Sequence, residues 1–149
     1  MTLKQKIYAH YLQVIHDKVA ILQKVLDDLK ESGANETKST AGDKHETALA
    51  MLQIEQANKR AQLQEILAQQ VMLEKIDPGL SVKIVLNGSL IKTNRGYLFM
   101  SIALGKAVVD EVTVIALSPA SPLGKKLMGL KAGDTTSINE IEYRIEDIE

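Results

Sequence analysis

Asp43 and Glu46 are the residues whose type and spacing most directly suggest chemistry. They lie in a polar stretch from residue 35 to residue 46, and side chains three positions apart are neighbours on a helix. Two neighbouring carboxylates can give oxygen ligands to a hard cation such as Mg²⁺, but a pair is too few for tight binding. The same Asp-x-x-Glu spacing is typical of a helix start capped by Asp43, with Thr40 as a second candidate cap. On spacing alone the cap is the better interpretation.

Two further residues of this stretch bear on a metal site. Lys44 and His45 stand between the acids, and a cation beside two carboxylates weakens a free-standing metal site. Lys44 could instead contact phosphate, and Glu36 is a candidate for a further acid. The remaining histidines, His10 and His16, are six apart, which does not bring two ligands to one helical face, so we expect them to face solvent.

The stretch is preceded by a long periodic segment, residues 3–31, that contains no Gly or Pro. Its apolar residues recur at intervals of four and three, as in a coiled-coil seam, and Gly33 signals the helix end. The predicted seam consists of Tyr8, Leu12, Ile15, Val19, Leu22, Leu26 and Leu29. A second stripe beside it consists of Ile7, Tyr11, Val14, Ile21 and Val25.

A second helix-forming segment runs from Asp43 to about Ile76. It also carries two stripes, and we expect the alanine-rich one to allow close approach to the first helix. That stripe consists of Ala50, Ile54, Ala57, Ala61, Ala68 and Val71, and the adjacent one of Leu49, Leu52, Leu63, Ile66 and Leu73. Two helices of about 45 Å each, joined by a short polar loop, predict an antiparallel coiled-coil hairpin over residues 1–76.

Residues 77–149 predict a separate domain of a different kind. Asp77-Pro78-Gly79 breaks the helix, and the hydrophobic period changes to two. Ser121 is a plausible N-cap, with Pro122 at the first helical position. The expected strands are residues 82–86, paired through an Asn87-Gly88 hairpin with 89–93, then 97–103, an apolar run 107–117 broken at Asp110-Glu111, and a closing hairpin of 135–138 and 142–148 around Asn139-Glu140. The predicted fold is therefore α+β, with a helical hairpin and a small antiparallel sheet carrying one short helix.

Composition excludes several classes of function. The chain has 18 basic and 19 acidic residues, evenly divided between its halves, so bulk charge does not favour nucleic-acid binding. Cysteine is absent, which excludes disulfides and thiolate metal sites. No stretch approaches a membrane span or the apolar part of a signal peptide, so we expect a cytoplasmic protein. The domain after residue 76 holds no nucleophile–base constellation, and we expect no enzyme active site there.

Three motifs resemble those of the Gre family, the GreA- and GreB-like bacterial transcript cleavage factors. The run Ser121–Asp134, Ser-Pro-Leu-Gly-Lys-Lys-Leu-Met-Gly-Leu-Lys-Ala-Gly-Asp, resembles the C-terminal signature of that family. Ala41–Glu46 is similar to the family's tip motif, and Val85–Ser89 to its Gly-Ser segment. The motifs follow the family's order over nearly the whole chain. The departures are Lys44 in place of a hydrophobic residue, Thr47 in place of Asn, and Leu49-Ala50 in place of an acidic–aromatic pair.

The resemblance implies a fold, a partner and a mechanism. The C-terminal domain would be FKBP-like and would dock at the secondary channel of RNA polymerase, with contacts from Ser121, Pro122, Leu123, Gly124 and Lys125. The coiled coil would enter the channel, where Asp43 and Glu46 would help to hold the second catalytic Mg²⁺ and a water. The polymerase would then hydrolyse backtracked RNA with its intrinsic nuclease activity.

The remaining expectations concern cofactors and alternatives. The protein would have no cofactor of its own, would meet the RNA 3′ end and DNA only indirectly, and would be a monomer. One alternative is a channel-binding regulator that modulates or inhibits transcription without stimulating cleavage. Another is a coiled-coil interaction module unrelated to polymerase, in which Asp-x-x-Glu is only a helix cap.

Overall fold

The computed structural model describes the backbone of residues 1–36 and 42–149, and the side chains of residues 1–33 and 46–149. Two long helices come first, α1 (Leu3–Glu36) and α2 (Gly42–Glu74). The chain forms two compact units, one of residues 15–70 and one of residues 1–14 with 71–149. Both helices therefore contribute to both units. No helix in the described part of the chain is long and apolar enough to cross a membrane.

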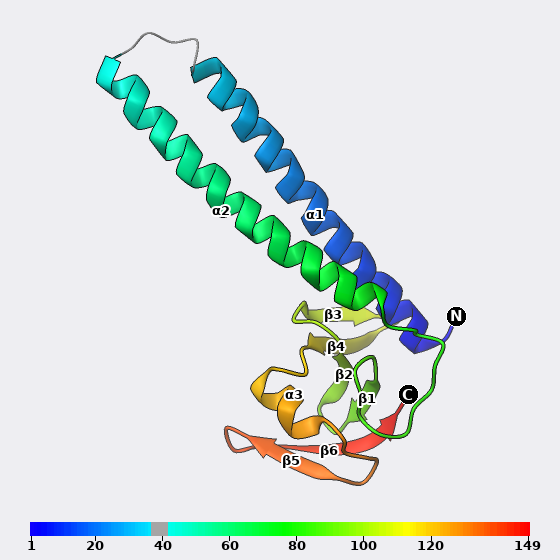
Figure 1. The fold of residues 1–149 in the computed structure, drawn as a ribbon. Helices are drawn as coiled ribbons and strands as arrows, with labels where there is room; N and C mark the ends of the chain where they lie inside the picture. Colours follow the sequence, from blue (N-terminus) through cyan, green and yellow to red (C-terminus); the bar gives the residue numbers. More distant parts are fainter. Residues whose placement is uncertain (37–41) are drawn as a thin grey trace. The chain divides into compact units, whose positions relative to one another are not determined.

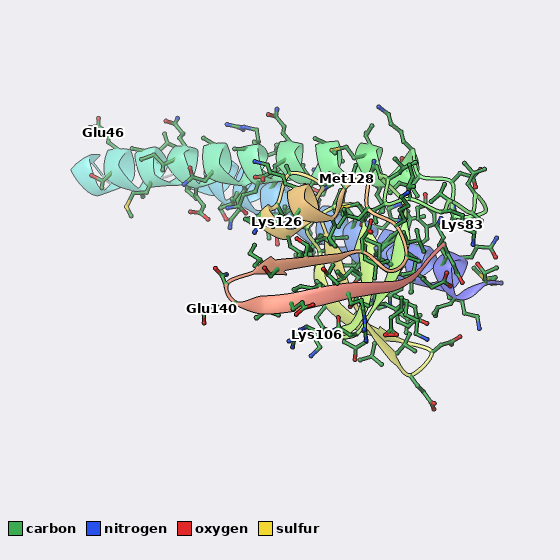
Figure 2. All side chains as sticks on the ribbon, turned by 90° about the horizontal axis from the view of Figure 1, so that it is seen from below. Glu46, Lys83, Lys106, Lys126, Met128 and Glu140 are labelled. Carbon is green, nitrogen blue, oxygen red and sulfur yellow. The ribbon has the colours of Figure 1, made fainter. Side chains whose placement is uncertain are left out.

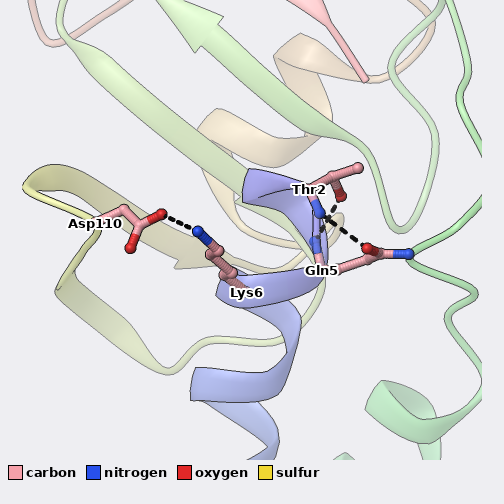
Figure 3. Close-up of polar contacts among 4 residues, drawn as sticks. All are labelled: Thr2, Gln5, Lys6 and Asp110. Carbon is pink, nitrogen blue, oxygen red and sulfur yellow. Dashed lines mark hydrogen bonds and ion pairs between the residues drawn. The ribbon is translucent and has the colours of Figure 1, made fainter.

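The first turn of α1 is fixed by a reciprocal cap. The backbone N–H of Gln5 donates to Thr2 Oγ1 at 3.1 Å, and the N–H of Thr2 donates to Gln5 Oε1 at 2.9 Å (Figure 3). This is the capping-box arrangement, which satisfies two of the donors left free at a helix start. At the other end α1 continues to Glu36, so the prediction that Gly33 ends the helix is wrong. Glycine lowers helix stability by only about 1 kcal/mol, and the packed hairpin outweighs that cost.

Within residues 15–70 the two helices lie side by side as a hairpin (Figure 1). The seam predicted for α1 is confirmed, since its members are buried or half-buried. For α2 the choice of stripe is wrong, because every member of the alanine-rich stripe is exposed. The seam is formed by the adjacent, leucine-rich stripe, because leucine buries more apolar area than alanine. Its buried and half-buried members include Leu49, Leu52, Gln56, Lys59, Leu63 and Ile66.

The second stripe of α1 is buried only in part. Ile7 and Tyr11 are fully buried in the unit that contains the sheet, and the Tyr11 ring stacks on Phe99 with centroids 6.2 Å apart. Ile21, in the other unit, is 64% exposed. The stripe therefore packs on the sheet at its beginning, whereas its later members are half-buried (Val14 and Val25) or exposed (Ile21).

The second half of the chain forms one six-stranded sheet and a short helix. The strand order is β3-β4-β2-β1-β6-β5. The elements are β1 (Leu90–Thr93), β2 (Gly96–Met100), β3 (Gly105–Val109), β4 (Val112–Leu117), α3 (Pro122–Leu127), β5 (Thr135–Ile138) and β6 (Ile141–Ile148). The α+β prediction is confirmed, but the sheet is mixed and not purely antiparallel, because β2 and β4 run parallel. Hydrophobic alternation indicates strands but does not identify their partners.

The predicted strand at residues 82–86 does not form. Ile84 makes only an isolated bridge to Lys131. Val85 is instead held by backbone hydrogen bonds to the segment after α3, donating to Leu130 O at 2.8 Å and accepting from Gly129 N at 2.9 Å. The turn at Asn87-Gly88 exists, with Ser89 N donating to Leu86 O at 3.1 Å, but it joins a loop to β1 and is no hairpin.

The two faces of the sheet are covered by different elements. Leu98 and Met100 belong to a buried cluster with Leu127 of α3. Phe99, between them on β2, points to the opposite face and meets Tyr11 of α1, because successive strand side chains alternate. The beginning of α1 and α3 therefore lie on opposite faces of the sheet.

Candidate functional site: the free end of α2 and the α3 loop

The acids that could bind a cation lie in the first turns of α2. The helix begins at Gly42, so Asp43 is its second residue and Glu46 its fifth. The prediction that Asp43 is the N-cap is therefore wrong, although an acid in the first turn still favours the positive helix end. Glu46 is exposed, near the N-terminal end of α2 (Figure 2).

The side chains of several predicted site residues lie outside the described part of the chain. The structure gives the helical backbone of Asp43, Lys44 and His45 but not their side chains, and the same holds for Glu36. Thr40 lies outside the described residues altogether. The backbone positions of Asp43 and Glu46 are three apart on α2, so the two residues share one helical turn.

The register of the hairpin determines where Glu46 stands. Gln56 Nε2 donates to Leu29 O at 3.1 Å, so these two residues lie at the same level. From there α2 continues for 14 residues to Gly42, about 21 Å, whereas α1 continues for 7 residues to Glu36, about 10 Å. The first turns of α2 therefore extend roughly 10 Å past the end of α1. Glu46 lies in this extension, where α1 no longer flanks the helix.

The described residues do not by themselves complete a metal site. Among the described residues there is no group of three or more side chains that could hold a metal ion. Asp43 and Glu46 offer carboxylate oxygens, the ligand type that Mg²⁺ prefers, but Mg²⁺ takes six ligands. Such a pair can act as part of a ligand set whose other members come from a partner.

The loop before α3 is organised by two serines. Ser121 Oγ accepts from Gly124 N at 3.0 Å, which caps α3, and donates to Ser118 O at 2.6 Å. Ser118 Oγ accepts from Ala120 N at 3.0 Å. The predicted N-cap at Ser121 and the first helical position at Pro122 are confirmed. Substituting such a cap costs about 1 kcal/mol.

Gly124 is required by close approach of the backbone. A Cβ at this position would lie 2.0 Å from Ser118 O and 2.8 Å from Ser121 Oγ. Leu123 is half-buried against the core cluster. Within the Ser121–Lys125 segment, Ser121, Leu123 and Gly124 shape the loop. Pro122 and Lys125 are exposed and available to a partner. The assignment of the segment to partner binding remains a prediction.

A shallow polar hollow lies beside α3. It has a volume of about 490 Å³ and is lined by Lys126, Thr135, Thr136, Ser137 and Glu142. Lys126 Nζ donates to Ser137 O at 2.7 Å, which ties α3 to β5. The lining residues include hydroxyls and a carboxylate but no histidine, so the hollow offers no assembled nucleophile and base.

Sequence reasoning missed a buried lysine. Lys4 is only 4% exposed, and its Nζ donates to Leu80 O at 2.6 Å. Its pKa lies below the ordinary value because burial penalises the charged form, while Glu149 and Asp77 oppose that shift. Its position between Leu3 and Ile7 in the first turn of α1 could have indicated burial from the sequence. Lysine is almost never fully buried, however, so burial was not predicted.

Comparison with known proteins returned distant matches. No model of a protein family matches the chain, and no curated protein does. Two of the matching solved structures are of one transcription factor, Gfh1. The first is GreA factor homolog 1 (Gfh1) of Thermus thermophilus, at 21% identity and a TM-score of 0.34, covering 97% of this chain and 93% of that one. The second, transcription factor Gfh1, gives 20% identity, a TM-score of 0.31, and coverage of 96% and 91%.

Both matches are below 25% identity and below a TM-score of 0.5, so neither assigns a family, an activity or a site to this chain.

Proposed function

We propose that this protein is a Gre-type factor that binds RNA polymerase at its secondary channel and stimulates cleavage of backtracked RNA. The observation that carries the proposal is the extension of α2 beyond α1, with Asp43 and Glu46 on its first turns. This arrangement places the two acids at the end of a hairpin, and the described residues contain no group of three or more side chains that could hold a metal ion. It suits a protein whose acids act in the active site of a partner, in the cytoplasm where polymerase works.

Asp43 and Glu46 would act on a cation that the polymerase holds. Mg²⁺ in a two-metal site stabilises the attacking and leaving oxygens of a phosphodiester. In that setting, added carboxylates supply oxygen ligands and orient a water by accepting its protons in hydrogen bonds. The protein is then an activator of the polymerase's nuclease activity and no enzyme itself.

The loop before α3 would give the docking surface. Ser121 and Gly124 hold the loop shape through the contacts above, and Pro122 and Lys125 present exposed surface. Lys125→Ala should weaken binding to purified polymerase and leave the unfolding curve unchanged, since the side chain is exposed. Lys83→Ala, another exposed lysine of the same unit, serves as the control (Figure 2).

A transcript cleavage assay tests the proposal. Added wild-type protein should shorten RNA in stalled polymerase complexes. The Asp43→Ala, Glu46→Ala double variant should lose this effect while still competing with wild-type protein for polymerase. Equal cleavage by the double variant would disprove the role of the two acids, and failure of both proteins to bind polymerase would disprove the family assignment.

One observation favours the alternative of a regulator that does not stimulate cleavage. Lys44 and His45 stand between the acids in the same helical turn, and Lys44 adds a positive charge near the proposed ligands. That regulator would bind polymerase, displace a cleavage-stimulating factor and slow transcription without shortening RNA. Lys44→Leu, which restores the hydrophobic residue of the motif, would then confer or increase cleavage.

A further inference from the structure

The outward side of α2 is unusually apolar for a face exposed to solvent. Met51 and Ile54 are 66% and 63% exposed, and the alanines on the same side are exposed as well. We name this the outer face of α2, and its members are Ala50, Met51, Ile54, Ala57, Ala61 and Ala68. The exposed residues of α1 are mostly charged, among them Lys18, Lys24, Asp27, Asp28, Lys30 and Glu31, although Ile21 is also exposed.

The outer face has the spacing of a coiled-coil seam. Ala50, Ile54, Ala57 and Ala61 follow at intervals of four, three and four, and Ala68 comes one heptad after Ala61. Gln64 fills the remaining core position. Since the leucine stripe already packs in the hairpin, α2 carries a second seam that is exposed among the described residues.

The charges beside this seam suit a second copy of the same helix. Arg60 precedes the core position Ala61 on one edge, and Glu65 follows the core position Gln64 on the other. Both side chains are exposed. In a parallel, in-register pair of helices, the residue just before a core position on one helix lies opposite the residue five positions later on the other helix. Arg60 of each copy therefore lies opposite Glu65 of the other copy. An antiparallel pair would bring like edges together and would lose both ion pairs.

We propose that two copies of this chain associate through the outer face of α2 as a parallel, in-register coiled coil. Ile54 packs on Ile54 of the second copy, Ala57 on Ala57, and two Arg60–Glu65 ion pairs close the edges. The two-fold symmetry makes the face self-complementary. Gln64 pairs with its counterpart and fixes the register, as polar residues in such seams do. The inference stands independently of the proposed function, and it differs from the monomer that the family resemblance implies.

We expect the association to be weak, because the seam is short and rich in alanine. The face from Ala50 to Ala68 is about 27 Å long, and most of its core residues are alanine. An interface of that size falls at the low end of specific protein interfaces. We expect a dissociation constant on the order of 10 µM, so the dimer forms at high concentration and dissociates on dilution.

A charge exchange gives the sharpest test. Arg60 and Glu65 have no charged residue three or four places away on α2, so their exchange alters no intrahelical ion pair. In sedimentation experiments Arg60→Glu and Glu65→Arg should each weaken self-association of the full chain at least about tenfold. The double variant Arg60→Glu, Glu65→Arg should restore it. Circular dichroism of each variant checks that the helices remain intact.

A disulfide test identifies the contacting face. The chain has no cysteine, so a single introduced one can form only an intermolecular disulfide. Ala57→Cys should give a disulfide-linked dimer on mild oxidation, and Ala20→Cys, an exposed alanine on α1, should not. The proposal is overturned if wild-type protein sediments as a monomer up to on the order of 100 µM. It is also overturned if the double variant fails to restore association, or if the two cysteine variants cross-link equally.

Discussion

The side chain of Gln56 on α2 donates a hydrogen bond to the backbone carbonyl of Leu29 on α1, at 3.1 Å. Gln56 occupies a seam position where an apolar residue would pack, and Gly33 lies beside its amide, with only ordinary contact space between them. A polar residue in a coiled-coil seam lowers stability but selects one register. In this hairpin the selected register is the one that carries the first turns of α2 beyond α1.

Gln56→Leu should therefore separate stability from function. The leucine buries more apolar area, and we expect the free energy of unfolding to rise by about 1 kcal/mol, measured by urea denaturation. Cleavage stimulation should fall, because the register is no longer fixed and the acids are less well placed. Gln53→Leu, at an exposed position of α2, is the matched control and should leave cleavage unchanged. Undiminished cleavage by Gln56→Leu would show that the hydrogen bond does not determine the position of the acids.

Tyr11 joins α1 to the sheet, and Tyr11→Phe tests that connection. Its hydroxyl donates to Gly105 O at 2.7 Å and lies 3.3 Å from Val114 O. Removing it leaves the buried Val114 carbonyl and the part-buried Gly105 carbonyl without this donor, so the free energy of unfolding should fall by about 1–2 kcal/mol. Tyr97→Phe is the control. If Tyr11→Phe were as stable as wild-type protein, the prediction would be contradicted, and water would have replaced the hydroxyl.

Gly124→Ala tests whether the α3 loop is held by backbone approach. The added methyl would meet Ser118 O at 2.0 Å, so the loop must move and the cap from Ser121 must break. We expect a loss of about 3 kcal/mol in thermal or urea unfolding. Ser121→Ala, which removes only the cap, should cost about 1 kcal/mol. If Gly124→Ala cost no more than Ser121→Ala, the close approach would not matter.

Lys4 should make stability depend on alkaline pH. Burial lowers its pKa in the folded chain below the ordinary value of 10.5, so between these two values the unfolded chain binds more protons. Stability therefore rises as pH increases through that window. Relative to Lys4→Met, wild-type protein should gain stability between neutral pH and about pH 10. The control is the exposed Lys83→Met, and parallel pH profiles for wild type and Lys4→Met would contradict the prediction.

The ion pair between Lys6 and Asp110 illustrates what sequence cannot supply. Lys6 Nζ lies 2.6 Å from Asp110 Oδ2, although the residues are 104 positions apart (Figure 3). The turn at Asp110-Glu111 was predictable, because two acids interrupt an apolar run, and both residues indeed have positive φ. The same holds for the turn at Asn139-Glu140 and for the cap of α3. These features are local, so a few adjacent residues determine them.

Features that depend on distant partners were predicted less well. Both stripes of α2 have coiled-coil spacing, and only packing against α1 decides that the leucine stripe is buried. Residues 82–86 alternate like a strand but pair with the segment after α3 through Val85. For the site, spacing identified Asp43 and Glu46 as one pair, but it could not show that α2 extends past α1. That extension comes from the register that Gln56 selects.

The Mg²⁺ dependence of RNA cleavage tests the central claim most directly. The claim is that Asp43 and Glu46 add ligands to a cation held by polymerase. Cleavage in stalled complexes would be measured over a range of Mg²⁺ concentrations, at saturating protein. Wild-type protein should lower the Mg²⁺ concentration that gives half-maximal cleavage, and the isosteric Asp43→Asn, Glu46→Gln variant should leave it at the value for polymerase alone. The same Mg²⁺ dependence with wild type and variant would contradict the account.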